Sequence, residues 1–302
     1  MWAIGRAAAR DNEVDMNFRQ RVGGRGAFDT RRSAHGHGRI STVFLAVLAA
    51  TATGGVVTWL SSSSSTSAAP KFAVFVFVFG LYFTVLCLHE FGHAYTAHRE
   101  GDGSIAARGY LDLNPMRYVN PVLSLLLPAI YLIIGALPLP GGAVQVNRAA
   151  IRSKRGAALV SAAGPLTNVL AAAISMALVS IFAQTDSFGS VSQIDVSQPH
   201  AYFWMGLAFF AYLQVAVAIL NLIPVPGLDG YGIIEPYLRF ETRRALEPVR
   251  QYGIFIVLLL LFFFPPVRDG FSTLINDILK AGKQPTEGAG QGQYLFQFWR
   301  SS

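Results

Sequence analysis

Long apolar runs, separated by short polar segments, make up most of this chain. A helix needs about 20 residues to cross the hydrocarbon core of a bilayer. We predict five membrane-spanning helices, at residues 42–60, 71–96, 157–183, 202–224 and 252–264. A sixth apolar run, at residues 121–140, is ambiguous because it contains prolines and a glycine. The pattern therefore predicts an all-α polytopic membrane protein.

Charged residues between the runs indicate which side of the membrane each end faces. Cytoplasmic loops carry an excess of Lys and Arg. Residues 1–40, 148–155 and 239–250 are basic, whereas residues 184–200 contain two aspartates and no Lys or Arg. We therefore expect a multi-pass protein of the cell membrane with a cytoplasmic N-terminus, two cytoplasmic basic loops and an external loop at 184–200.

The run at 121–140 decides whether this topology is consistent, because a single crossing there would place residues 148–155 outside. Pro128 and the prolines and glycines that follow it favour a re-entrant loop. Irregular backbone at membrane depth is tolerated where protein shields it from lipid. A plain transmembrane helix, with a weaker charge rule, is the alternative.

Composition and charge narrow the class of protein further. The chain has 52% hydrophobic and 14% charged residues, which is typical of a membrane protein and not of a soluble domain. Its net charge of +7 does not indicate nucleic-acid binding, because the arginines cluster beside apolar runs. We expect a disordered basic tail at 1–40, a membrane-embedded domain at 41–268 and a C-terminal tail at 269–302.

The segment His89-Glu90-Phe91-Gly92-His93 ends one apolar run and has the spacing of a zinc site. Two histidines four residues apart lie on one helix face, where both imidazoles reach one metal ion. A carboxylate next to the first histidine is placed to take a proton from zinc-activated water. The spacing also arises by chance, but ionisable residues inside a membrane are costly and usually functional. We predict that His89 and His93 bind zinc and that Glu90 transfers protons.

A zinc site needs a further protein ligand, and Asp229 is the candidate. It follows the run at 202–224, and the topology places it on the same membrane side as His93. An Asp-Gly pair alone is a common turn, whereas beside a histidine pair at matching depth it favours a carboxylate ligand. Cys87 is the only cysteine, so no intrachain disulfide forms, and we expect it to be a buried bystander and not a ligand.

Three blocks of sequence together resemble the site-2 protease family of intramembrane zinc metalloproteases. They are HEFGH at 89–93, AGPLTN at 163–168 and NLIPVPGLDG at 221–230, in the family's order, and the resemblance covers about residues 74–232. It implies His89, His93 and Asp229 as ligands of one Zn2+ per chain and Glu90 as the catalytic acid/base. It also implies a three-helix catalytic core with flanking transmembrane helices. The inserted PDZ-like domain and the nucleotide-sensing C-terminal domain of some members are not evident.

Two asparagines in these blocks are further candidates. Asn168 shares a helix face with Gly164, and it is a candidate donor to the developing oxyanion or to the substrate backbone. A hydrogen bond between helices is its alternative role. Asn221 is either functional or a partner for carbonyls released by Pro224. His98 follows the histidine pair off its face, and we expect it at the membrane interface.

The double glycine at 141–142 introduces a segment, ending at Asn147, that is a candidate short β segment at the membrane. In the resembled family, such edge strands are thought to pair with an unwound substrate helix. Main-chain pairing of that kind requires no particular substrate sequence.

The expected function is that of a zinc endopeptidase which cleaves peptide bonds within or next to transmembrane segments. The expected partners are the lipid bilayer and membrane-protein substrates such as membrane-anchored regulators, with no nucleic acid. One alternative is a non-proteolytic scaffold or chaperone of the same fold. Another is a metal transporter that uses the same three ligands as a transit site, which the adjacent Glu90 disfavours.

Overall fold

The computed structural model describes residues 38–61, 68–118 and 144–300. Within them, helices long and apolar enough to cross a membrane are α2 (Thr42–Leu60), α3 (Ala68–Arg99), α7 (Lys154–Phe182) and α8 (Ala201–Leu222). They match four of the predicted spans, with ends shifted by a few residues. The predicted re-entrant run at 121–140 and residues 1–37 of the predicted tail lie outside the described residues.

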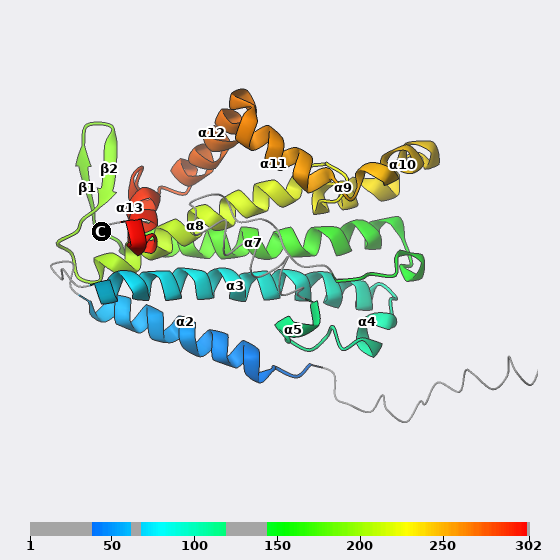
Figure 1. Ribbon diagram of the computed structural model, residues 1–302, viewed down its shortest axis with the longest axis horizontal. Coiled ribbons are helices and arrows are strands. Elements are labelled where there is room, and N and C mark those ends of the chain that lie inside the picture. The colour runs from blue at the N-terminus through cyan, green and yellow to red at the C-terminus, as the bar shows by residue number, and fades with distance from the viewer. Residues whose placement is uncertain (1–37, 62–67, 119–143, 301–302) are drawn as a thin grey trace, which may run out of the picture. The chain divides into compact units, whose positions relative to one another are not determined.

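The four long helices pack against one another in chain order, so that α3 contacts α2 and α7, and α7 contacts α8 (Figure 1). In the most apolar stretch of α8, 83% of the residues are buried. The corresponding share is 28% in both α2 and α7. Other parts of the protein therefore surround α8. The outer faces of α2 and α7 instead present apolar side chains of the kind that lipid contacts.

Small residues allow α2 and α3 to approach closely. A Cβ atom at Gly54 would lie 2.8 Å from the backbone nitrogen of Phe77, and a Cβ atom at Gly80 would collide with Oγ1 of Thr51. In lipid, the hydrophobic effect does not drive helices together, so close van der Waals packing supplies much of their attraction.

The connection between α7 and α8 forms an antiparallel hairpin of β1 (Thr185–Phe188) and β2 (Val191–Ile194), in which Thr185 pairs with Ile194. Gly189 in its turn has a φ of 65°, which favours glycine. Gln291, in α13 (Gly288–Phe296), donates to the carbonyl of Ile194 at 3.0 Å and accepts from its N–H at 2.8 Å. The hairpin and α13 therefore mark the same end of the bundle.

A cluster of buried aromatic residues joins α3, α8 and α13 near this end. The ring centroids of Phe209 and Phe296 lie 5.4 Å apart, and Phe77 belongs to the same cluster. Gly292 lets α13 approach α8, because a Cβ atom there would collide with the carbonyl of Met205. We call Phe77, Phe209 and Phe296, one from each of these helices, the aromatic cluster.

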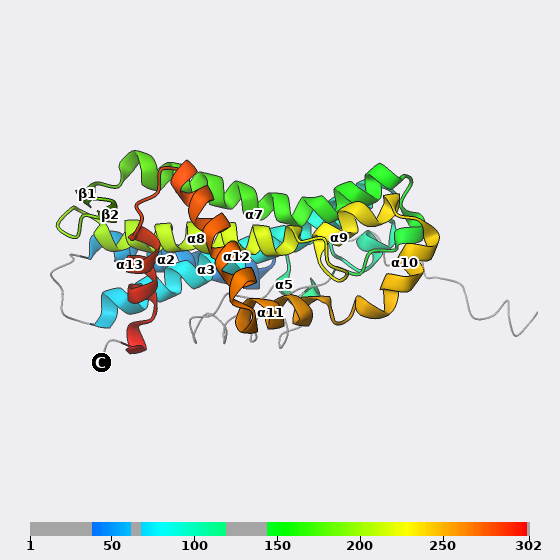
Figure 2. The same cartoon turned by 90° about the horizontal axis from the view of Figure 1, so that it is seen from above.

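The fifth predicted span, at 252–264, is an 11-residue helix, α11 (Gly253–Phe263). It is bent by 65° from the helical stretch Phe240–Val249, so the two form at most one broken span. Two prolines then begin α12 (Pro265–Ala281), whose buried face contacts α8 (Figure 2). The buried residues of α12 are Phe271, Ile275 and Leu279. Most of the predicted C-terminal tail at 269–302 is therefore helical and packed on the bundle.

Short helical turns complete the described chain and carry several residues of the site. They are α4 (Ser104–Ala107), α5 (Pro115–Tyr118), η3 (Arg148–Ala150), α9 (Asp229–Ile234), η4 (Glu235–Tyr237), α10 (Phe240–Leu246), η5 (Glu247–Val249) and η6 (Phe298–Arg300).

Candidate metal centre

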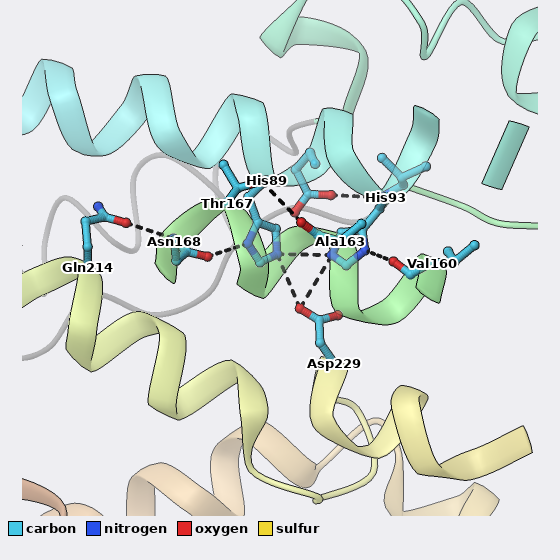
Figure 3. Close-up of polar contacts among 10 residues, drawn as sticks. His89, His93, Val160, Ala163, Thr167, Asn168, Gln214 and Asp229 are labelled. Atoms are coloured by element: carbon cyan, nitrogen blue, oxygen red, sulfur yellow. Dashed lines mark hydrogen bonds and ion pairs between the residues drawn. The ribbon is translucent and has the colours of Figure 1, made fainter. Parts of the chain in front are cut away.

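The three predicted metal ligands converge on one point between α3 and the first turn of α9 (Figure 3). The Nε2 atoms of His89 and His93 lie 3.1 Å apart. Oδ2 of Asp229 lies 3.3 Å from the first nitrogen and 3.4 Å from the second. Within the described residues, this is the only group of three or more His, Cys, Asp or Glu side chains that could hold a metal ion.

These spacings fit a single zinc ion. Zinc bonds of about 2.1 Å in a tetrahedral arrangement place neighbouring ligand atoms about 3.4 Å apart. Two imidazole nitrogens and one carboxylate oxygen also form a donor set that zinc prefers, and three protein ligands leave one position open, as in catalytic zinc sites. Cys87 is buried and is not part of this group.

Each histidine is held by a hydrogen bond at its other ring nitrogen. Nδ1 of His93 donates to the carbonyl oxygen of Val160 at 2.7 Å, and Nδ1 of His89 donates to Oδ1 of Asn168 at 2.6 Å. A proton on Nδ1 leaves the lone pair of Nε2 free for a metal ion. The surrounding protein therefore selects the tautomer and the ring orientation that metal binding needs.

The hydrogen bonds continue from Asn168 to a residue that the sequence analysis missed. Nδ2 of Asn168 donates to Oε1 of Gln214 at 2.8 Å, and both side chains are buried (Figure 3). The sequence signal for Gln214 was an amide in the middle of the apolar run at 202–224. Polar residues inside membrane helices usually have a partner or a function.

Close contact between α3 and α7 depends on two glycines. A Cβ atom at Gly164 would collide with Nε2 of both His89 and His93. A Cβ atom at Gly92 would lie 3.1 Å from the carbonyl oxygen of Ala163. The AGP sequence in α7 therefore forms a wall of backbone against which both imidazoles lie.

The loop between α8 and α9 presents Asp229 to the histidines. Gly227 has a φ of 100°, and a Cβ atom at Gly230 would collide with the carbonyl of Leu222, so both glycines are needed for this tight loop. Burial by itself would raise the pKa of Asp229. With the imidazoles protonated, charge attraction to His93 and hydrogen bonds from both rings outweigh burial and hold that pKa below its ordinary range, so the carboxylate is ionised, and a bound metal ion would replace those protons.

Glu90 is buried beside the ligand group, and its carboxylate accepts a hydrogen bond of 3.2 Å from the N–H of Val144. Together with the three ligands it lines a cavity of about 370 Å³. Asn168 and Asn221, both buried, line the same cavity, whereas His98 does not. Nδ1 of His98 is buried without a hydrogen-bond partner in the described part of the chain.

The described part of the predicted short β segment, residues 144–147, lies in no strand. Side-chain carboxylates accept from two of its backbone N–H groups: Val144 donates to Glu90, and Asn147 donates to Oδ2 of Asp102 at 2.7 Å. Asp102 is fully buried and also accepts bonds from Ser104. The segment is thus fixed at the cavity by carboxylates, and the strand pairing in the described chain occurs in the β1–β2 hairpin instead.

An ionic cluster borders the cavity on the side of α9. The buried carboxylate of Glu235 contacts Arg148, and Nη1 of Arg250 lies 3.6 Å from its other oxygen. Both arginines line the cavity. Because Glu235 follows α9 directly, this cluster ties the segment that carries Asp229 to two separate parts of the chain.

Comparison with known proteins identifies the family. The sequence pattern described as Peptidase family M50 matches residues 129–264. Rip2 of Mycobacterium tuberculosis (strain H37Rv), named as a zinc metalloprotease, is 40% identical over 261 residues, which cover 86% of this chain and 95% of that protein. Its counterpart in Mycolicibacterium smegmatis is 38% identical over the same coverage.

A more distant relative is YwhC of Bacillus subtilis, also named as a zinc metalloprotease. It is 33% identical over 182 residues, which cover 59% of this chain and 76% of that protein. No solved structure matches the chain. The family match, the apolar helices and the extent of similarity to Rip2 together show that this chain belongs to peptidase family M50, the site-2 protease family, and is a membrane-embedded, zinc-dependent metalloprotease.

Proposed function

We propose that this protein is an intramembrane protease that cleaves peptide bonds within or next to the transmembrane segments of membrane-protein substrates, such as membrane-anchored regulators. The supporting observation is a single cavity lined by His89, Glu90, His93 and Asp229. Three of these residues belong to α3, which is long and apolar enough to cross a membrane. Peptide bonds at membrane depth are therefore within reach of the site.

We assign His89, His93 and Asp229 as the ligands of one zinc ion per chain. When bound, zinc polarises the scissile carbonyl and makes water a stronger nucleophile at neutral pH. Glu90 accepts the proton of the attacking water and delivers it to the departing amine. The N–H of Val144 orients the Glu90 carboxylate for these transfers.

Asn168 belongs to the proposed site as well. Its amide oxygen accepts from His89 and its amide nitrogen donates to Gln214. These contacts favour a positioning role over donation to the oxyanion, because both ends of the amide are engaged by protein. Asn221, buried in the cavity wall, is the remaining candidate for contact with substrate.

A substrate helix must unwind before cleavage, because its carbonyls are otherwise occupied by helical hydrogen bonds. Water reaches the site from the cavity side lined by Arg148 and Arg250. We place this side, and the N-terminus, in the cytoplasm on the basis of the basic segments at 148–155 and 239–250.

A scaffold that binds transmembrane helices without cutting them is the alternative, and it leaves the buried Glu90 beside the metal ligands without a use. Glu90→Gln separates the two functions. We expect proteolysis to fall by about a hundredfold or more, the usual scale of acid/base catalysis, with zinc content unchanged. Glu241→Gln, at an exposed carboxylate in α10, is the matched control and should cleave normally.

The measurement compares membrane-protein fragments from cells that express each variant, by mass spectrometry, and repeats the comparison with purified enzyme in detergent. Fragments that end within or beside transmembrane segments should disappear with Glu90→Gln alone. Equal fragment patterns in all three strains would contradict the proposal.

Topology is tested separately with an impermeant thiol reagent in intact cells that carry Cys87→Ala. A cysteine at Ser190, in the hairpin turn, should react, and a cysteine at Thr242, in α10, should react only after lysis. Labelling of Thr242→Cys from outside would reverse the proposed orientation.

A further inference from the structure

We propose that Gln214 is a positioning residue for the metal centre, and that it orients the His89 imidazole through Asn168. This inference rests on the proposed ligand set. The three side chains form one chain of hydrogen bonds that crosses three helices: His89 in α3, Asn168 in α7 and Gln214 in α8 (Figure 3).

The direction of this chain follows from its metal end. Nε2 of His89 faces the ligand group, so its proton lies on Nδ1, which donates to Oδ1 of Asn168 at 2.6 Å. The amide nitrogen of Asn168 then faces Gln214, and only an acceptor completes the chain at that point. Oε1 of Gln214 supplies this acceptor at 2.8 Å.

The surroundings of Gln214 support a role beyond packing. The side chain is 1% exposed, and its Nε2 atom has no hydrogen-bond partner among the described residues. A buried amide with an unpaired donor is costly, and an apolar residue would avoid that cost. Its neighbours in α8, Leu213 and Val215, are apolar and buried. The oxygen of Gln214 is therefore the atom that the site uses.

The chain of hydrogen bonds from His89 through Asn168 to Gln214, which we call the relay, also links two metal ligands through one helix. α8 carries Gln214 and leads directly into the loop that presents Asp229. A shift of α8 therefore moves the third ligand and the hydrogen-bond support of the first ligand together. Outer-shell partners of this kind typically change metal affinity by about 10- to 100-fold when they are removed.

The test measures zinc affinity by competition with a chelator, together with the absorption spectrum of the Co2+-substituted protein, which reports ligand geometry. Gln214→Leu removes the acceptor, and we expect zinc affinity to fall by about tenfold or more, with an altered Co2+ spectrum. Gln214→Glu keeps an acceptor of the same length and should retain most of the affinity. Ser175→Ala, a buried polar position two turns along α7 from Asn168, is the matched control and should bind zinc normally.

A pair of isosteric changes tests the direction of the relay. In Asn168→Asp, an oxygen still accepts from His89, and the amide of Gln214 turns over to donate to the other oxygen. In the double variant Asn168→Asp with Gln214→Glu, two acceptors face each other, so the loss of affinity should exceed the sum of the two single losses.

Two results would overturn the relay: equal losses in Gln214→Leu and Gln214→Glu, or additive losses in the double variant. Asp229→Ala, measured alongside, separates this failure from a failure of the ligand set. If Asp229→Ala loses zinc while Gln214→Leu binds as wild type, the relay is wrong and the ligands stand. If Asp229→Ala keeps its zinc, the proposed ligand set itself is wrong.

Discussion

The two ends of the bundle are held together by different kinds of contact, although α3, α7 and α8 run through both. Near the hairpin, the aromatic cluster packs α3, α8 and α13 through apolar side chains. Near α9, apolar packing is joined by a set of buried polar side chains that directed hydrogen bonds connect, as in the relay from His89 to Gln214. Apolar packing tolerates small shifts, whereas hydrogen bonds to a metal ligand do not. The difference predicts that stability and metal binding depend on opposite ends.

The largest expected effect is at the polar end, in Asp229→Ala. Removal of an anionic ligand should lower bound zinc and proteolysis together, because two imidazoles alone form an incomplete site. Elemental analysis of the purified variant checks the zinc content. Thermal unfolding of the metal-free variant should resemble that of the metal-free wild type. A normal zinc content would place the third ligand elsewhere.

A smaller effect is expected for Gly164→Ala, which adds one methyl group where both histidine rings touch α7. The rings must shift, and we expect zinc affinity to fall by about tenfold, as for other disturbances around metal ligands. Gly270→Ala, in α12, is the control, because a Cβ atom there meets nothing within 4 Å. Equal zinc affinity in the two variants would show that the backbone wall of α7 is dispensable.

The smallest effect on metal binding is expected in the aromatic cluster. Phe209→Ala removes a buried ring that faces Phe296, and we expect the free energy of unfolding in detergent to fall by about 3–5 kcal/mol. Zinc affinity of the folded protein should stay unchanged. Phe255→Ala, at a ring that is 60% exposed on α11, should change neither quantity. A loss of zinc affinity in Phe209→Ala would show that the two ends are coupled.

The convergence of the three candidate ligands was largely predictable from sequence, because local spacing and the charge pattern carry the information. The spacing of His89 and His93 fixes their shared face, and the charge pattern brings Asp229 to the same side. The partner of Asn168 was not predictable, because the apolar run around Gln214 carries no periodicity that shows which way a side chain faces. Partners in different helices depend on how the helices rotate against one another.

The C-terminal region shows the same limit. The run at 252–264 is apolar enough for a span, but Gly253 and the prolines at 265 and 266 confine α11 to 11 residues. The apolar stripe of α12 is not evident in the sequence, because polar residues such as Ser272, Asn276 and Asp277 separate its members. Residues 144–147 did not form the expected strand, since Glu90 and Asp102 take up backbone N–H groups that a strand would use. That competition arises only from tertiary contacts.

The position of α13 has a consequence for biosynthesis. It covers Met205 and Phe209 of α8, yet α9 to α12 are synthesised between the two helices. While the ribosome adds these intervening residues, this face of α8 is inserted but uncovered, and a folding factor or another apolar segment has time to occupy it. The proposed metal ligands are all synthesised before α13, so every residue of the candidate site is present before the opposite end of the bundle closes.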